Sequence, residues 1–347
     1  MIVPTGIGCT IGGYAGDALP SARLLAAASG CLITHPNVMN GASLYWNDPR
    51  MHYVEGWAIN QLICRNICLS PSRQQHVGLL FDSGLELELK YRNLQVADAC
   101  RASLGLKIGP VVDTDQKLEI KLETNHSGVS WGSIGNPDTL IRAGERLLEA
   151  GVTAIAIVTR FPEDIGNEAT NLYREGKGID TLAGTEAVIS HLLSSHLRVP
   201  CAHAPALNPL PLIPILDPRA AGEELGYTFL TCVLVGLSRA PNLIWVNEIR
   251  SDYKNSGSFC ITGSSIGAVI VPANSLGSEA VLASVERGIP IITVHDNSCI
   301  LNVGSYDLDV KTLNTKNYAE AAGLVLALRE GIAFESLCRP INQLNYL

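Results

Sequence analysis

Short apolar runs with the length of buried strands alternate along this sequence with helical stretches of about twelve residues. The clearest runs are 76–81, 153–158, 267–272 and 289–294. Two neighbouring parallel strands need a crossover connection of this length, and a helix usually supplies it. The runs are apolar throughout because helices cover both faces of a parallel sheet. The pattern therefore predicts an α/β fold with a mostly parallel, doubly wound sheet.

Two stretches interrupt this alternation and suggest two lobes. Residues 117–123 alternate strictly between polar and apolar side chains, which is typical of a half-exposed strand in a hairpin or at a sheet edge. Residues 205–218 are rich in proline, which excludes regular structure and predicts a linker or a rigid segment packed across a surface. We expect an N-terminal α/β lobe at 1–204 with an edge hairpin near 105–136, a Pro-rich crossover at 205–218, and a C-terminal α/β lobe at 219–347.

The composition limits the classes of partner and the compartment. Only 17% of the residues are charged and the formal net charge is −8, without clusters of Lys and Arg, so nucleic acid and anionic membranes are disfavoured as partners. No apolar run reaches the roughly 18 residues of a membrane span, and no signal peptide precedes the first strand, so we expect a cytoplasmic protein. Scarce charge leaves apolar surface and predicts a homo-oligomer. We expect the cysteines to be thiols and predict no metal site.

A glycine-rich turn, residues 5–16, follows the first short strand. The N–H groups of such a turn, placed before a helix, are suited to bind an anion. The spacing of Gly6, Gly8 and Gly12 is similar to a dinucleotide-binding loop, but the third glycine is displaced by one position. The second strand also ends at Thr34-His35 instead of an acidic residue, which disfavours NAD(P). A phosphate or carboxylate ligand and a purely structural turn remain as alternatives.

Polar side chains gather where the predicted strands end, which is the edge where open parallel sheets bind ligands. The acid–base candidates are His35, Asp82, His126 and His203, and Arg160 is the candidate counter-charge for an anion. The further ligand-binding candidates are Thr5, Gly6, Gly8, Thr10, Gly12, Gly13, Asn37, Asn40, Asn274, Ser275, Gly277, Glu279, Asp296 and Asn297. Each of these residues also has a structural interpretation as a cap or turn residue.

Two resemblances follow from local motifs. Asn274-Ser275, a helix containing Glu279, Gly288-Ile289-Pro290 and Asp296-Asn297 occur in an order that resembles the sugar-nucleotide-binding half of the UDP-N-acetylglucosamine 2-epimerase and glycosyltransferase-B group. That group has Arg where this chain has His295. The whole chain resembles an uncharacterised family of cyanobacteria and photosynthetic eukaryotes, through Gly6-Ile7-Gly8, residues 34–42 and residues 201–206. The second resemblance implies a cytosolic or stromal protein and no particular activity.

These observations predict a small-molecule metabolic enzyme that binds an anionic metabolite, phosphorylated or carboxylated, in a cleft between two lobes. The reaction is open, with isomerase and transferase slightly favoured. The cofactor is also open: NAD(P) is disfavoured, whereas Mg²⁺ is compatible. The alternatives are an enzyme similar to nucleotide-sugar epimerases or transferases, and a non-enzymatic metabolite-binding or regulatory protein.

Overall fold

The first of two parallel sheets contains strands from both ends of the chain. The computed structural model describes residues 1–10, 13–45, 47–124, 129–162, 167–226, 228–248, 260–344 and 346. The strand order of the first sheet is β15-β14-β13-β1-β2-β3, and all its pairs are parallel. Its strands are β1 (Ile2–Val3), β2 (Leu32–Thr34), β3 (Met51–Tyr53), β13 (Val269–Pro272), β14 (Ile291–Val294) and β15 (Leu313–Thr315). The predicted α/β fold with parallel sheets is confirmed.

The second sheet is formed by the middle of the chain and is also parallel, in the order β10-β9-β5-β6. Its strands are β5 (Val77–Phe81), β6 (Ile108–Asp113), β9 (Ala154–Arg160) and β10 (Cys201–Ala206). Two smaller antiparallel sheets join β4 (Ile67–Ser70) to β11 (Asn242–Trp245) and β12 (Ile261–Thr262), and β7 (Ile120–Thr124) to β8 (Ser130–Ile134). The structure thus contains the expected hairpin, although β8 lies where the sequence suggested a loop.

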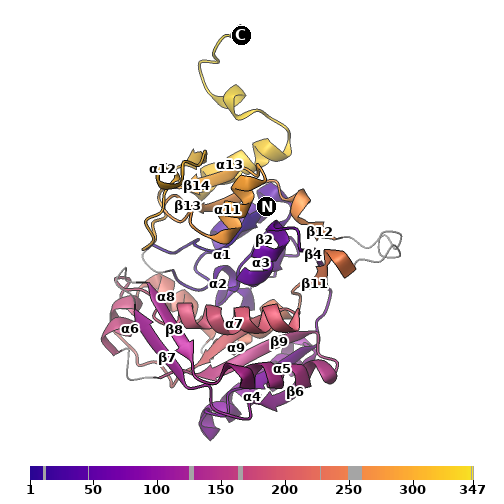
Figure 1. Cartoon of the computed structure of the whole chain (residues 1–347). Helices are drawn as coiled ribbons and strands as arrows, with labels where there is room; N and C mark the ends of the chain where they lie inside the picture. The colour runs from indigo at the N-terminus through magenta and orange to yellow at the C-terminus, as the bar shows by residue number, and fades with distance from the viewer. Residues whose placement is uncertain are drawn as a thin grey trace.

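The two sheets divide the chain differently from the expected lobes. Because β1 pairs with both β2 and β13, the N-terminal 53 residues share a sheet with residues 269–315. We call this sheet with its helices the first lobe, and the second sheet with its helices the second lobe; Figure 1 shows them above and below each other. The Pro-rich run leaves β10 and leads to α8 (Pro218–Glu223) within the second lobe. It is therefore a segment of one lobe and not the crossover between the two.

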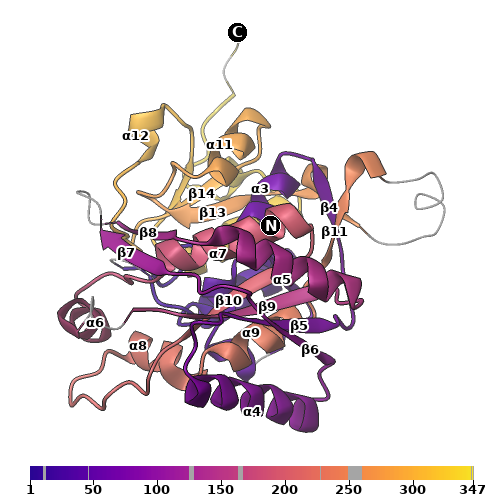
Figure 2. The same cartoon turned by 60° about the horizontal axis from the view of Figure 1, so that its bottom comes forward.

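Helices cover both faces of each sheet. In the first lobe, α1 (Leu19–Ser29) packs with α13 (Tyr318–Arg329) on one face, and α3 (Gly56–Ile63) with α11 (Glu279–Glu286) on the other. In the second lobe, α5 (Pro137–Glu149) and α7 (Ala183–Leu197) cover one face, and α4 (Leu87–Leu104) and α9 (Leu230–Leu237) the other. Figure 2 shows these layers of the second lobe from below. The remaining helices are α2 (Pro36–Met39), α6 (Asn167–Arg174) and α12 (Ser305–Leu308).

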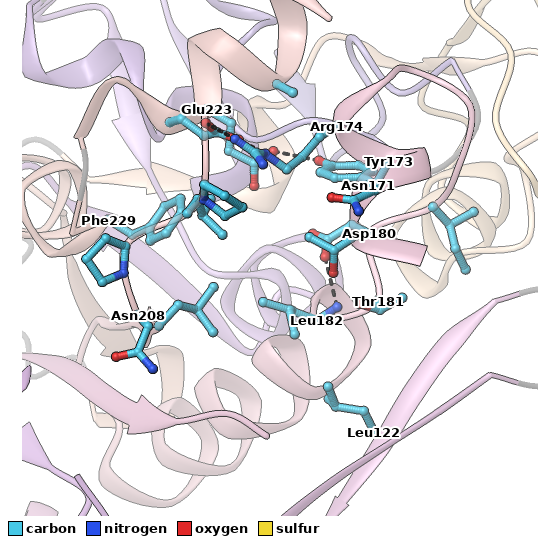
Figure 3. Close-up of a pocket in the computed structure, with 18 of the residues that line it drawn as sticks. Leu122, Asn171, Tyr173, Arg174, Asp180, Thr181, Leu182, Asn208, Glu223 and Phe229 are labelled. Carbon is cyan, nitrogen blue, oxygen red and sulfur yellow. Dashed lines mark hydrogen bonds and ion pairs between the residues drawn. The ribbon is translucent and has the colours of Figure 1, made fainter. Parts of the chain in front are cut away.

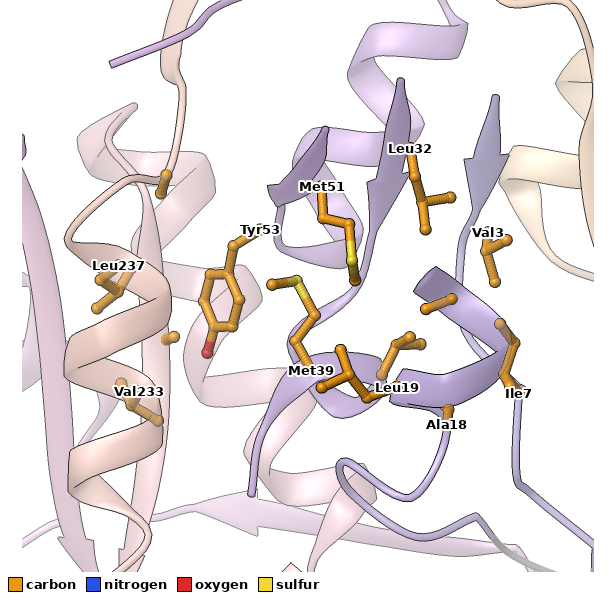
Figure 4. Packing of buried hydrophobic residues seen from close by; sticks show 14 of the residues in the cluster. Val3, Ile7, Ala18, Leu19, Leu32, Met39, Met51, Tyr53, Val233 and Leu237 are labelled. Carbon is orange, nitrogen blue, oxygen red and sulfur yellow. The ribbon is translucent and has the colours of Figure 1, made fainter. Parts of the chain in front are cut away.

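Helix α9 joins the cores of the two lobes. The apolar run 228–237 has the pattern of a buried strand, but the structure forms a helix there. The segment is apolar on all sides because it is buried, and such a pattern does not distinguish a short helix from a strand. One side of α9 packs on the second sheet, and Val233 and Leu237 share a core cluster with Met39 and Tyr53 of the first lobe (Figure 4). A Cβ atom at Gly236 would lie 2.4 Å from the Tyr53 ring. The close approach of these two residues fixes the lobes against each other.

One bent pair of helices in the described part of the chain has the length and composition of a membrane span. Among the residues that the structure describes, no single helix is long and apolar enough to cross a bilayer. By length and composition alone, residues 218–226 together with α9 would suffice, with a bend of 72° between them.

Candidate functional site

The opening turn, the residues after β13 and the residues after β14 meet at the carboxyl edge of the first sheet, as expected. Asn297 makes the link: its Oδ1 accepts a hydrogen bond from the Thr10 N–H at 3.2 Å, and its Nδ2 donates to the carbonyl oxygen of Gly6. Asn274 Nδ2 donates to the carbonyl oxygens of Cys299 and Leu301 at 3.0 and 2.7 Å. The opening turn and the turn after β13, which begins at Asn274, both contact the segment after β14 and are therefore neighbours.

The donors of the opening turn are largely used within the protein. The N–H groups of Cys9, Gly13 and Gly16 donate to backbone carbonyl groups, and that of Thr10 donates to Asn297. The Asp17 carboxyl group packs directly against Gly8, where a Cβ atom would lie 1.8 Å from Asp17 Oδ1. Burial raises the pKa of Asp17 to about 7, against an opposing effect of Arg219. An acidic side chain on the turn disfavours an anion at this position.

Asp82 and Arg160 lie at the end of the second sheet but are engaged in local structure. Asp82 accepts hydrogen bonds from the N–H groups of Gly84 (2.8 Å), Leu118 (3.2 Å) and Arg160 (3.3 Å). The Arg160 guanidinium pairs with Glu86, with Nε at 3.0 and 2.8 Å from the two carboxylate oxygens. The expected counter-charge is thus already neutralised by an acid of the same chain.

The remaining predicted residues are dispersed. Asn40 accepts a hydrogen bond from the Tyr53 hydroxyl, and Glu279 accepts one from Asn60 Nδ2. Asn37 donates its N–H to His35, and Ser275 contacts Cys299. Thr5, Gly277 and Asp296 remain at the carboxyl edge of the first sheet. Gly12 and His126 lie outside the described residues.

His35 lies at the contact between the two lobes. It caps α2, where its Nδ1 accepts the Asn37 N–H at 3.2 Å. Burial lowers its pKa, so the ring is neutral at pH 7 and its other nitrogen, Nε2, carries the proton. His35 and His191 both pack against Gly56, within 3.4–3.6 Å of the position of a Cβ atom. His191 belongs to α7 of the second lobe, so this contact brings a predicted residue together with one that was not predicted.

The buried Glu55 holds His191 in place. Glu55 caps α3 by accepting the Trp57 N–H at 2.9 Å, and its other oxygen lies 2.7 Å from His191 Nδ1. Burial acts to lower the pKa of His191, but the Glu55 carboxylate outweighs this, and the pKa is raised. The pair is therefore an ion pair between the lobes, at a position where His191 is partly exposed.

His203 was expected at the end of its strand, but it lies within β10, three residues before the strand ends, and it is enclosed by the protein. Its Nε2 lies 2.6 Å from the Thr159 hydroxyl, and its ring contacts the Phe161 ring edge-on at 5.3 Å. Nδ1 has Glu186 Oε2 at 3.9 Å and makes no hydrogen bond within the described residues. Glu186 is the link between the two predicted histidines, because its charge also acts on His35.

A cavity of about 250 Å³ lies between α6 and the Pro-rich run (Figure 3). Its wall includes Tyr173 and Asp180 on one side and Asn208 and Phe229 on the other, with Glu223 at one end. The Pro-rich run supplies residues 207–211, so it packs as one wall of this cavity. The cavity belongs to the second lobe, and its wall touches the first lobe through the opening turn.

The carboxyl groups of this wall titrate abnormally. Burial and the neighbouring Glu186 charge raise the pKa of Asp180 to about 7. Burial, with Asp180 as the next cause, raises the pKa of Glu223 well above its usual range. Carboxyl groups that lie close together in low dielectric cannot all ionise. At neutral pH this group of acids therefore retains protons.

Hydrogen-bond geometry supports a protonated Glu223. The Tyr173 hydroxyl oxygen lies 2.8 Å from the Gly13 carbonyl oxygen and 2.6 Å from Glu223 Oε2. A hydroxyl group has one proton, and the carbonyl oxygen can only accept. Both contacts are satisfied when Tyr173 donates to Gly13 and a protonated Glu223 donates to Tyr173. This arrangement ties the cavity to the opening turn.

Asp180, Glu186, Glu223 and His191 were missed by the sequence reasoning. Asp180 ends a Gly- and charge-rich stretch whose composition indicates a loop, and Glu186 and His191 lie within 185–197, whose pattern indicates a helix. One signal was available: these two ionisable residues interrupt the apolar sequence of α7. Their proximity to His35 and His203 depends on the docking of the lobes.

A metal site receives no support. Among the described ranges, no group of three or more His, Cys, Asp or Glu side chains is arranged to hold a metal ion.

Comparisons with known proteins identify a family but no activity. The family described as "Protein of unknown function (DUF3326)" matches residues 1–338. The chain is 47% identical over 347 residues to the "Uncharacterized lipoprotein syc1174_c" of Synechococcus sp., covering all of this chain and 95% of that protein. A crystal structure of the transcription regulator CcpA of Lactococcus lactis aligns with 75% of this chain and 93% of its own at 12% identity, but the TM-score of 0.17 carries no argument. The chain therefore belongs to the DUF3326 family of proteins of unknown function.

Proposed function

We propose that this protein is a small-molecule enzyme that performs acid–base chemistry in the second-lobe cavity, with Asp180 and Glu223 as the proton-transfer groups. The observation that carries the proposal is the raised pKa of two carboxyl groups on the wall of one cavity. Perturbed ionisable groups in a cavity are typical of catalytic sites. A carboxyl group with a pKa near 7 exchanges protons most effectively at neutral pH. Isomerisation and group transfer both use such a group.

The charges of the wall favour an uncharged or cationic ligand. Arg174 is the cation of the described lining, and its guanidinium is held by Glu224 at 2.6 and 3.1 Å. Asp180 and Glu223 face the same space, so their ionised fraction would repel a phosphate or carboxylate of the ligand. Polar donors and acceptors from Asn171 and Asn208 and the apolar Phe229 suit a polyol or an amine. The anionic metabolite expected from the sequence stays a prediction that the same experiment tests.

Glu186 acts as a positioning residue in this proposal. Its charge raises the pKa of both cavity acids, and its carboxylate lies beside His203 and acts on His35. Of these four groups, only His35 belongs to the first lobe, whereas the other three lie in the second lobe together with Glu186. Glu186 thereby connects the protonation of the cavity to the lobe contact at His35.

The test is a thermal-shift screen of the full chain at pH 7 against polyols, primary amines, phosphorylated metabolites and carboxylated metabolites, each with and without Mg²⁺. A stabilising ligand is then measured with Asp180→Asn and Glu223→Gln. We expect each variant to fold and to lose at least tenfold in affinity or in turnover, which is about 1.4 kcal/mol.

The matched control is Glu175→Gln, which removes a carboxylate beside α6 that is paired with Lys177 and lies outside the cavity lining. This variant should bind and turn over like the parent. Equal affinity in all three variants would show that the site is elsewhere. A shift only with anionic metabolites would reinstate the ligand class that the sequence suggested.

A second candidate is an enzyme acting on a nucleotide sugar. The feature that supports it is the β13–α11–β14 unit, in which Asn274, Ser275 and Glu279 lie between two parallel strands. It predicts that UDP stabilises the protein against heat and that Glu279→Gln weakens this effect. The absence of any shift with UDP would remove this candidate.

The cytoplasmic location and the homo-oligomeric state remain our proposals for this chain. The Synechococcus relative is named a lipoprotein, so membrane attachment is the alternative location. Separation of cells into membrane and soluble fractions distinguishes the two. Light scattering after size exclusion measures the oligomeric state.

A further inference from the structure

Two cysteines from opposite ends of the sequence meet at the carboxyl edge of the first sheet. Cys9 lies in the opening turn and is buried, and Cys299 follows β14 and is partly exposed. Cys9 Sγ lies 3.7 Å from Oδ1 of Asn297, two residues before Cys299. Cys9 Sγ also lies 3.6 Å from the carbonyl oxygen of Ser298, the residue next to Cys299. Both residues are free thiols in this structure.

The surroundings of Cys299 favour a thiolate. Its sulfur lies 2.6 Å from the Ser275 hydroxyl, which can donate a hydrogen bond to a thiolate, whereas Asn274 Oδ1 at 3.5 Å only accepts and favours the thiol form. The neighbouring Cys9 thiol lowers the pKa of Cys299 to about 6, assisted by Ser275 and opposed by burial. The proximity of Cys299, with burial, raises the pKa of Cys9. At neutral pH one sulfur is thus a nucleophile and the other a protonated donor beside it.

We propose that Cys9 and Cys299 form a peroxide-responsive site, in which Cys299 is oxidised first and Cys9 then closes a disulfide. The Cys299 thiolate attacks one oxygen of hydrogen peroxide, the O–O bond breaks, and hydroxide leaves. The sulfur of Cys9 then attacks the Cys299 sulfenic acid, the S–O bond breaks, and the proton of Cys9 leaves with the hydroxide as water. The two sulfurs lose two electrons in total, and the peroxide is reduced to water.

The disulfide would connect the turn after β1 to the segment after β14. These strands belong to one sheet although about 290 residues separate them in the chain. A cross-link that closes so long a loop restricts the unfolded chain strongly and stabilises the folded state. The site is separate from the cavity proposed for catalysis, so it stands without that proposal.

A second thiol contact provides an internal comparison. Cys68 of β4 pairs across the strands with Thr262, two residues after Cys260, and burial raises the pKa of Cys68 to about 11. Cys338 is exposed and has no cysteine partner among the described residues. A peroxide attack governed only by proximity would oxidise both pairs, whereas a thiolate mechanism selects Cys9 and Cys299.

The experiment treats the reduced full chain with hydrogen peroxide at pH 7, followed by digestion without reductant and mass spectrometry. We expect a peptide linked through Cys9 and Cys299 to appear before any link between Cys68 and Cys260. The oxidised protein should melt about 3–8 °C higher, and a reducing agent should reverse this shift.

Two variants separate the steps. Cys9→Ser keeps a hydroxyl donor beside Cys299, so sulfenic acid should accumulate at Cys299 and react with dimedone. Cys338→Ser should behave like the parent. A peptide map of the oxidised parent without the link between Cys9 and Cys299 would overturn the proposal, whatever the variants do. So would dimedone labelling of Cys338 in preference to Cys299 in the Cys9→Ser protein.

Discussion

Replacement of Asp180 by asparagine should make the protein more stable at alkaline pH. The pKa of Asp180 is raised from 3.8 to about 7 by burial and by Glu186. A difference of about three pKa units corresponds to about 4 kcal/mol at 1.36 kcal/mol per unit. Water reaches part of this side chain, so we expect a gain on the order of 2–4 kcal/mol in the free energy of unfolding at pH 8.

The sign follows from proton binding. Between about pH 4 and pH 7 the folded state keeps a proton on Asp180 that the unfolded state has released. The contribution of this group to stability is therefore complete below pH 4 and is lost as the pH rises through about 7. Asparagine carries no such proton, and its amide oxygen can still accept the Leu182 N–H that Asp180 accepts at 2.8 Å.

The assay is urea denaturation of the parent and of Asp180→Asn from pH 4 to pH 8.5, with Glu175→Gln as control. The difference in unfolding free energy should be near zero at pH 4, grow up to pH 7 and then stay constant. A difference that does not change with pH would refute the raised pKa, and so would a loss of stability at pH 8. The catalytic proposal would then lose its main support.

Three further substitutions test the contact between the lobes. Gly41→Ala should cost about 3 kcal/mol in thermal or urea denaturation, because Gly41 has φ +81° and a Cβ atom would lie 2.6 Å from the carbonyl oxygen of Gly222. Gly236→Ala should cost about 1–2 kcal/mol by the same measurement, since overlap with the Tyr53 ring outweighs the better helix propensity of alanine. His191→Gln should cost at most about 1 kcal/mol at pH 5.5 and nothing at pH 9, because the raised pKa of this partly exposed histidine gives stability that is present at low pH and lost as the pH rises through it. A pH-independent cost would contradict the ion pair with Glu55.

The regular elements of the second sheet could be predicted because each is specified locally. The apolar runs at 76–81 and 153–158 are long enough for buried strands and lie between helices. The short strands β3 and β4 are not evident from the sequence, because the pattern over 52–68 is typical of a single helix, whereas the structure has α3 between the two strands. Three or four residues leave too little periodicity to recognise.

The candidate site could be predicted only in part. The sequence identified His35 and His203 because polar residues follow their strands, and it identified the meeting of the opening turn with Asn297 because both follow strands of one parallel sheet. It assigned Arg160 to a ligand, since nothing local indicates that Glu86 neutralises it.

The sequence by itself determined the α/β class, the parallel strands and the glycine-rich turn, because these depend on side-chain periodicity and local backbone preferences. Only the tertiary structure decided that both ends of the chain share a sheet, and that α7 brings Glu186 and His191 to His35. It also decided which acids retain protons. The pKa of Asp180 depends on its burial and on the charge of Glu186, which lies six residues further along the chain, in α7. Pairing between distant segments and the desolvation of side chains arise only when the chain is packed. A local pattern of residues therefore does not reveal them.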